Sequence, residues 1–169
     1  AVEAGPDGLF RFRIKVEGEA GTFVERVDYP LLPLAAPLQG DGAGDALVLG
    51  TTKGGVLERP HLWKPGRSAA GTQPGSLAAQ FGCYYGAKGG VVTYCEDDAG
   101  HPKTLLAVRT AHGLVLGWRH LMRHDLQKPV ALSFAVVAGV FRGAAGTATD
   151  WRDAAAIYKA WALHQPWCV

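Results

Sequence analysis

The sequence predicts an all-β protein, an antiparallel β-sandwich with one C-terminal α-helix. Three observations support this fold class. Short segments of alternating apolar and polar residues recur along the chain, and 23 glycines and 10 prolines separate them. Consecutive strands are joined by hairpin-length turns, with no alternation of strands and helices. Convincing helical periodicity occurs only near the C-terminus, so we expect a sandwich over residues 1–149 and a helix packed on it over residues 150–169.

Length and charge exclude several classes of protein. The 169 residues fit one domain, or one domain plus a junction. The net charge is only +2, from 17 basic and 15 acidic residues, which argues against nucleic acid as the main partner. No run of about 18 apolar residues is present, so no membrane-spanning helix is expected. We therefore expect neither nucleic acid nor a membrane as a partner.

Cysteine and histidine spacing predicts no metal site and no cofactor. Cys83 and Cys95 flank a hairpin centred on Gly89, where they are either a cross-strand disulfide or two small buried residues. Cys168 is left over in both cases. His120 and His124 have the i, i+4 spacing of helical zinc ligands, but their segment has the pattern of a strand end and no third ligand is indicated.

Two alternating strands open the chain. Leu9–Val16 places Phe10, Phe12, Ile14 and Val16 on one face and basic residues on the other. Thr22–Tyr29 alternates in the same way, and the two segments predict a first hairpin. The proline-broken run Pro30–Pro37 is typical of an edge strand.

The middle of the chain contains two short strands and a long irregular region. Strands are expected over Ala46–Thr51 and Gly54–Glu58, and Arg59–Ser76 is expected to be a long loop that either has a function or is disordered. Trp63 within this loop is a sugar-stacking platform, a plug against a neighbouring domain, or an anchor of the loop.

Two further hairpins and a central strand follow. Leu77–Tyr85 pairs with Val91–Asp97 across a glycine-rich connection, and Lys103–Thr110 pairs with Leu114–Leu121, which is followed by a polar connection. Asp97 and Asp98 begin the next turn. A calcium site is not expected there, because no further acidic residues are spaced to complete its ligands. Apolar residues on both faces of Val130–Phe141 predict a strand covered on both sides.

The C-terminal helix has a clear start and one apolar face. Asp150 is the expected N-cap, and Asp153 can complete a capping-box-like arrangement. Pro166 is expected to end the helix. The residues that share one face are Trp151, Ala154, Ala155, Tyr158, Trp161, Ala162 and Gln165.

The tail DWRDAAAIYKAWALHQPWC resembles a junction found in bacterial glycoside-hydrolase-like proteins of a domain-of-unknown-function family. There, a β-sandwich related to the galactose-mutarotase "supersandwich" precedes a (β/α)₈ barrel. The junction has the pattern D-W-R-x-A-A-x-I-Y-x-x-W-A-x-x-Q-x-W-C. This pattern is met by Asp150, Trp151, Arg152, Ala154, Ala155, Ile157, Tyr158, Trp161, Ala162, Gln165, Trp167 and Cys168.

Weaker similarity to the same family extends over most of the chain. The similar segments are Gln80-Phe81, Tyr84-Tyr85, Gly89-Gly90, a strand leading to Asp98, Gly100 and Lys103, and the opening hairpin with Val27, Tyr29 and Pro30. The sequence departs from the pattern at Cys83 and Cys95, where small residues are usual, and at Gly86, where an aspartate is expected.

The resemblance implies a non-catalytic accessory domain in carbohydrate degradation. Its partner would be a catalytic (β/α)₈ barrel of the same polypeptide, with the two catalytic carboxylates on barrel strands, so no catalytic residue is carried over to this chain. Trp161 and Trp167 are then the expected domain-interface residues, since the tail carries no charge after His164. The uncharged end of the chain suggests that the catalytic part lies beyond Val169.

Two alternatives remain open. A free-standing carbohydrate-binding module would stack sugars on Trp63, Trp118, Tyr84 or Tyr85. A mutarotase-like epimerase would need a carboxylate and a histidine as acid and base, for which Glu96, Asp97, His101 and His120 are available. A glycan is a possible partner in each case. The compartment stays open between the bacterial cytoplasm and the periplasm or exterior.

Overall fold

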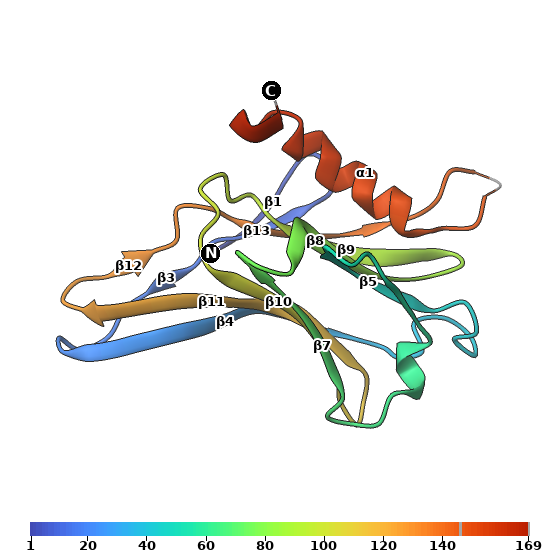
Figure 1. The fold of residues 1–169 in the computed structure, drawn as a ribbon, viewed down its shortest axis with the longest axis horizontal. Coiled ribbons are helices and arrows are strands. Elements are labelled where there is room, and N and C mark those ends of the chain that lie inside the picture. Colours follow the sequence, from blue (N-terminus) through green and yellow to red (C-terminus); the bar gives the residue numbers. More distant parts are fainter. Residues whose placement is uncertain (146, 169) are drawn as a thin grey trace.

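The computed structural model describes residues 1–145 and 147–168, and in these ranges the chain forms an all-β sandwich-like fold with one α-helix (Figure 1). All strand pairs are antiparallel. The larger sheet has the order β1 (Val2–Ala4), β2 (Phe10–Phe12), β13 (Val136–Phe141), β9 (Gly89–Cys95), β8 (Leu77–Gly86), β5 (Ala46–Thr51), β6 (Val56–Glu58). The smaller sheet has the order β4 (Thr22–Leu34), β11 (Leu114–Leu126), β10 (Lys103–Arg109), β7 (Ser68–Gln73). A short ribbon pairs β12 (Val130–Ala131) with β3 (Lys15–Val16).

The main core lies between the two sheets. Because side chains alternate across a strand, alternate residues of β5, β10 and the first part of β11 point into this layer. Leu47 and Tyr84 enter it from the larger sheet, and Leu105 and Trp118 enter it from the smaller sheet, each without exposed surface.

Helix α1 (Trp151–Ala162) covers the outer face of the larger sheet. Its N-terminus has the predicted capping box, in which the Asp150 carboxylate accepts from Arg152 N at 2.6 Å and Asp150 N donates to Asp153 Oδ2 at 2.9 Å. The helix ends at Ala162, earlier than expected, and Pro166–Cys168 form the 3₁₀ turn η2. The Gln165 side chain donates to Trp161 O at 3.0 Å, which satisfies a terminal carbonyl and stabilises this earlier end.

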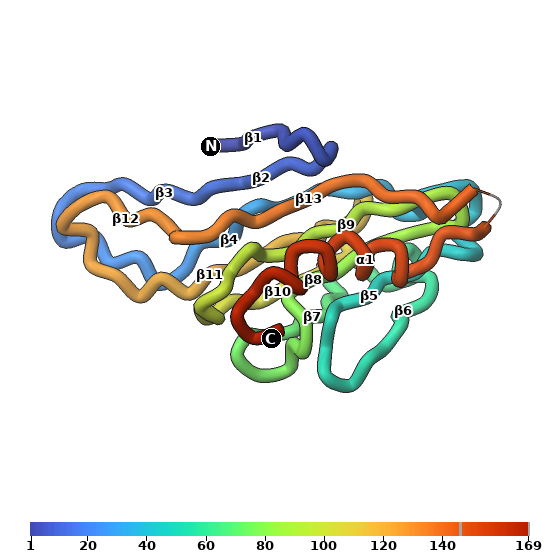
Figure 2. Tube along the Cα trace, turned by 90° about the horizontal axis from the view of Figure 1, so that it is seen from above, coloured from blue at the N-terminus to red at the C-terminus, as the bar shows by residue number. Residues whose placement is uncertain are grey.

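The predicted apolar face of α1 packs on β8 and β9. Ala154 has no exposed surface, which lets the helix approach the sheet closely. The Tyr158 ring stacks on Phe81 at 5.4 Å between ring centroids and meets Tyr94 edge-on at 5.8 Å. From above, β13, β2 and β1 lie on one side of α1, and β5 and β6 lie on the other (Figure 2). A second buried layer is therefore present between helix and sheet.

Most of the predicted strands are confirmed. β8 and β9 form a hairpin with Ala87 and Lys88 in its turn, and β10 and β11 form the next one. Pro30 and Pro33 lie in β4, which is an edge strand as their missing N–H groups require. β13 lies between β2 and β9, and it is buried on both faces, as expected, except at Val140, which is 79% exposed.

The predicted first hairpin is wrong. β2 pairs with β1 and β13 in the larger sheet, whereas β4 pairs with β11 in the smaller sheet. The alternating run Leu9–Val16 is interrupted at Arg13 and Ile14, so its two ends enter different sheets. Alternation identifies a strand but not its partner, which explains the error.

Three other boundaries also differ from expectation. The predicted loop Arg59–Ser76 contains the 3₁₀ turn η1 (Pro60–Leu62) and the strand β7, whose small residues give no strand signal. A Cβ on Gly71 in β7 would lie 2.6 Å from Leu77, so this strand requires a small residue there. β11 continues to Leu126 through the expected polar connection, and Val130–Phe141 is split into β12 and β13. Val169 lies outside the described residues.

Candidate functional site

The four aromatic residues predicted to bind sugar are core residues. Trp118 and Tyr84 have no exposed surface, and Tyr85 and Trp63 are 8% and 9% exposed. The Trp118 indole donates to Thr93 Oγ1 at 3.0 Å, and the Tyr84 hydroxyl donates to the Asp45 carboxylate. Their ring faces are covered by neighbouring side chains, so in this structure they stabilise packing and present no stacking surface to a glycan.

Trp63 has the simplest of its three proposed roles. It packs in the core between the sheets, and the Arg67 guanidinium lies 4.8 Å from its ring centroid. The indole is thus an anchor that ties the segment between β6 and β7 to the sandwich.

The cysteines and histidines are also placed by packing. Cys83 lies under α1 and Cys95 lies between the sheets, so the two thiols are on opposite faces and are free. His120 is buried and shares a hydrogen bond with Tyr29 O at 2.8 Å, whereas His124 is exposed. Across residues 1–145 and 147–168, no group of three or more His, Cys, Asp or Glu residues is arranged to hold a metal.

Two of the titratable residues considered for epimerase chemistry, Asp97 and His101, stabilise a turn instead. The buried Asp97 carboxylate pairs with Lys103 and accepts from the backbone N–H groups of Ala99 at 3.2 Å and His101 at 2.7 Å. Nδ1 of the His101 ring lies 2.7 Å from Oδ1 of the same Asp97 carboxylate. Burial alone would raise the pKa of Asp97, but hydrogen bonds from Lys103 and His101 outweigh it and lower the pKa. The carboxylate therefore stays charged and fixes the β9–β10 turn.

Glu96 belongs to a separate charged cluster beside α1. Arg11 Nη2 lies 3.2 Å from Glu96 Oε1 and 2.9 Å from Asp7 Oδ2. The hydrogen bond from Arg11 is the main cause that lowers the pKa of Asp7. These three residues and Trp161 line a groove of about 440 Å³ between α1 and the β1–β2 hairpin. Charges of both signs are paired there.

An aromatic surface lies at the C-terminal end of α1. Trp161 contacts Tyr94 at 6.2 Å and Trp167 at 5.7 Å, measured between ring centroids. Trp167 is 47% exposed and Leu163 is 58% exposed. We call Trp161, Leu163 and Trp167 the helix-end surface. It includes both residues predicted to form a domain interface.

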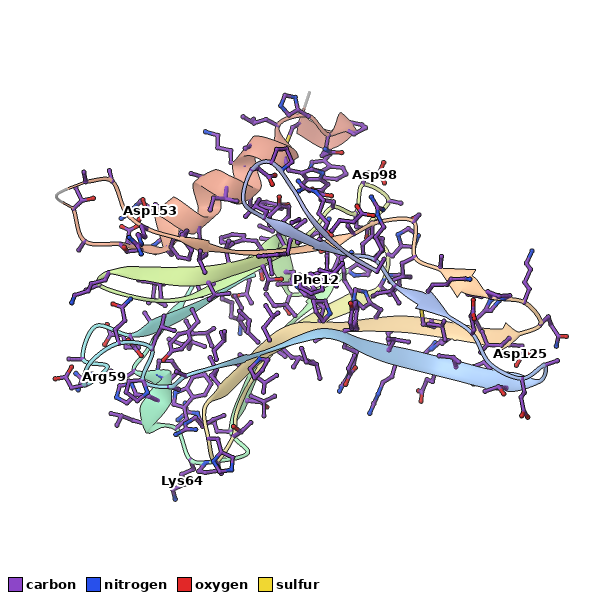
Figure 3. All side chains as sticks on the ribbon, turned by 180° about the vertical axis from the view of Figure 1, so that it is seen from behind. Phe12, Arg59, Lys64, Asp98, Asp125 and Asp153 are labelled. Carbon is purple, nitrogen blue, oxygen red and sulfur yellow. The ribbon has the colours of Figure 1, made fainter. Side chains whose placement is uncertain are left out.

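A polar hollow of about 280 Å³ lies next to this surface. Its lining residues come from β7, β8, the β9–β10 turn, α1 and η2, and they are Gln73, Ala78, Gln80, Asp98, Ala99, Gly100, Tyr158 and Trp167. Figure 3 shows Asp98 near the C-terminal end of α1, far from Asp153 at the other end. Reasoning from sequence did not identify this hollow as a site, because its residues are far apart in the chain and follow no periodicity.

Within the part of the chain that the structure describes, no helix is long and apolar enough to span a membrane. The sequence matches no protein-family model, and a search of curated proteins gave no significant match.

Proposed function

We propose that this chain is a non-catalytic accessory β-sandwich domain of a glycoside-hydrolase-like protein that degrades carbohydrate. In this proposal, the helix-end surface packs against a catalytic (β/α)₈ barrel of the same polypeptide. The observation that carries the proposal is the continuous aromatic contact from Tyr94 in the sheet, through Trp161, to the half-exposed Trp167.

The helix-end surface is suited to docking because it is apolar and rigidly supported. Trp161 and Tyr158 pack on each other at 5.8 Å, and Tyr158 stacks on the sheet through Phe81. Aromatic side chains held in this way lose little conformational entropy on binding. Covering them with a partner removes apolar area from water at about 25 cal/mol per Å².

The polar chemistry of the chain supports a structural role. Asp97, Lys103 and His101 close one turn, and Arg11, Asp7 and Glu96 pair with one another beside α1. The resemblance of the tail to a junction before a barrel supplies the identity of the partner and the carbohydrate context.

Comparing this chain with the complete gene product tests the proposal. We expect the complete gene product to contain a barrel domain that hydrolyses glycosides, and this chain alone to give neither hydrolysis nor anomerisation. In hydrogen exchange, the indole N–H of Trp167 should be more protected in the complete product than in this chain. Trp118, whose indole is bonded in the core, is the internal control. Glycoside turnover by this chain alone, or equal exchange at Trp167 in both proteins, would rule the proposal out.

A carbohydrate-binding role is the second candidate. The observation that favours it is the polar hollow beside Trp167, which combines amide, carboxylate and aromatic groups. The buried aromatic residues first considered for this role do not contribute to it.

A further inference from the structure

We infer that the polar hollow beside Trp167 binds one ring of a neutral saccharide. The inference gives a ligand and a set of residues to the second candidate function, and it does not require the accessory role. At about 280 Å³ the hollow is close to the lower end of the roughly 300–1,000 Å³ range of small-molecule pockets.

Gln80, which lines the hollow, carries an unpaired buried acceptor. Gln80 is only 7% exposed, and its amide Nε2 donates to Asp97 O at 2.9 Å. Gln80 Oε1 is buried and has no hydrogen-bond partner among residues 1–145 and 147–168. Rotating the amide would set its oxygen against the Asp97 carbonyl, so the present orientation is the favoured one. A buried acceptor without a donor is unfavourable, and a small rotation of the Gln80 side chain toward the hollow would let a hydroxyl group there, directly or through a water molecule, donate to it.

The wall formed by the β9–β10 turn is preorganised. Asp98, Ala99 and Gly100 form the tip of the turn that the buried Asp97 carboxylate holds through two backbone N–H groups. Gly100 has φ +70°, a conformation that disfavours other residues, and the Gln73 amide nitrogen lies 3.9 Å from the point where a Cβ would be. A wall that does not reorganise on binding loses less free energy when a ligand enters.

The remaining lining offers a ring face and further hydrogen-bonding groups. The Tyr158 hydroxyl accepts from Gln80 N at 3.4 Å, which leaves its own proton free to donate. Trp167 meets Trp161 edge-on, at an interplanar angle of 61°, and is half-exposed. An aromatic ring beside amide and carboxylate groups suits a pyranose, which has an apolar C–H face and hydroxyls on its rim.

The charge of the lining selects among ligand classes. Asp98 contributes a carboxylate, and none of the lining residues is Lys or Arg. A phosphate or carboxylate ligand would therefore meet a like charge without a counter-ion. A cation could use Asp98 and Trp167, but it would leave the donors of Gln73 and Tyr158 without acceptors. Neutral hydroxyl groups donate and accept, so they match the whole set.

Titration of this chain, uniformly labelled with ¹⁵N so that indole and backbone signals are both observed, tests the inference. The probes are methyl galactoside, methyl glucoside and methyl mannoside at millimolar concentrations, with tetramethylammonium chloride and sodium phosphate as comparison ligands. We expect at least one glycoside to move the Trp167 indole signal in a saturable manner. The Trp118 signal, from an indole bonded to Thr93 in the core, should stay in place.

Exposed lining residues supply the variants. Asp98→Ala and Trp167→Ala each remove one contact, and we expect each to weaken glycoside affinity about tenfold or more, equivalent to about 1.4 kcal/mol. For Trp167→Ala, affinity is read from backbone signals of residues 98–100. Leu163→Ala is the matched control, because Leu163 is 58% exposed at the same helix end but does not line the hollow. Each variant is checked for an unchanged unfolding midpoint.

Three results would overturn the inference: no response to any glycoside, a response that both variants retain, or a response to tetramethylammonium or phosphate alone. None of them bears on the accessory role, which depends on what the complete gene product does. Conversely, a complete gene product without a barrel would leave this titration unaffected.

Discussion

The carboxylate of Asp97 and the ammonium of Lys103 form an ion pair in which neither side chain has exposed surface. Lys103 also donates to His101 O at 2.9 Å, and its ammonium lies 5.2 Å from the ring centroid of Phe134. The pair therefore closes the connection between β9 in the larger sheet and β10 in the smaller sheet. Its contribution to the free energy of unfolding depends on the burial of both charges away from water.

Replacing Lys103 with methionine should lower the free energy of unfolding by about 3–5 kcal/mol, because Asp97 would be left as an uncompensated buried charge. The double variant Asp97→Asn/Lys103→Met should lose less than the sum of the two single variants. Urea denaturation measures each value. Arg119→Met is the control, because it breaks the partly exposed Asp28–Arg119 pair and should cost only about 0–1 kcal/mol. Equal losses at both pairs would contradict the role of burial.

Stability should fall as the pH is lowered from about 6.5 to about 4, because burial lowers the pKa of His120 from 6.5 to about 4. In this window the unfolded chain binds a proton at His120 and the folded chain does not, so unfolding becomes more favourable by on the order of 3 kcal/mol. His120 Nε2 faces Tyr29 O and Nδ1 has no partner among the described residues, so the charged form gains no contact.

The His120→Gln variant should show a flatter dependence on pH in that window, as measured by thermal unfolding at several pH values. Asp97 affects stability at pH values just below this window. Its lowered pKa means that its contribution to stability is present above about pH 4 and is lost below that value. A wild-type profile that is flat between pH 6.5 and pH 4 would show that His120 is not buried as described.

Ala154→Leu should destabilise the protein by about 1–3 kcal/mol, because Ala154 is fully buried where α1 contacts the larger sheet. Ala156→Leu is the matched control. It adds the same atoms to the same helix at an exposed position, so it should change stability by less than about 0.5 kcal/mol. Chemical denaturation followed by tryptophan fluorescence distinguishes the two. Equal effects would mean that the predicted face of α1 is not the packed one.

One thiol should react with a disulfide reagent at neutral pH in the native protein, and three should react after denaturation without reductant. Cys168 is exposed, whereas Cys83 and Cys95 are buried and free. Burial raises the pKa of Cys83 to about 12 and raises that of Cys95 as well, so neither forms a thiolate under these conditions. Recovery of only one thiol in denaturant would indicate the cross-strand disulfide that the hairpin spacing allowed.

The elements with strong local signals were predictable. The capping box at Asp150 and Asp153, the apolar face of α1 and the pairing of β8 with β9 all depend on residues close in sequence. The pairing of the opening strands was not predictable, since the pattern of Leu9–Val16 fits either sheet equally well. β7 was missed because Ser, Ala and Gly carry little strand propensity, although the open edge of β10 accepts them.

The candidate sites were also predictable only where the sequence carries a local signal. Trp161 and Trp167 could be proposed from an uncharged tail, and they do lie at an exposed helix end. Trp63, Trp118, Tyr84 and Tyr85 were proposed because of residue type, and type does not reveal burial. Gln73, Gln80 and Asp98 line one hollow only because two strands and a turn converge there, which no spacing along the chain encodes.

The β8–β9 hairpin is buried on both faces, and this links two parts of the molecule that lie on opposite sides of it. Tyr84 packs toward the smaller sheet, while its neighbour Tyr85 packs toward α1. A shift of one residue in the pairing of β8 with β9 would exchange the two sets of side chains and misplace both layers at once. The helix and the smaller sheet should therefore be lost in a single cooperative transition.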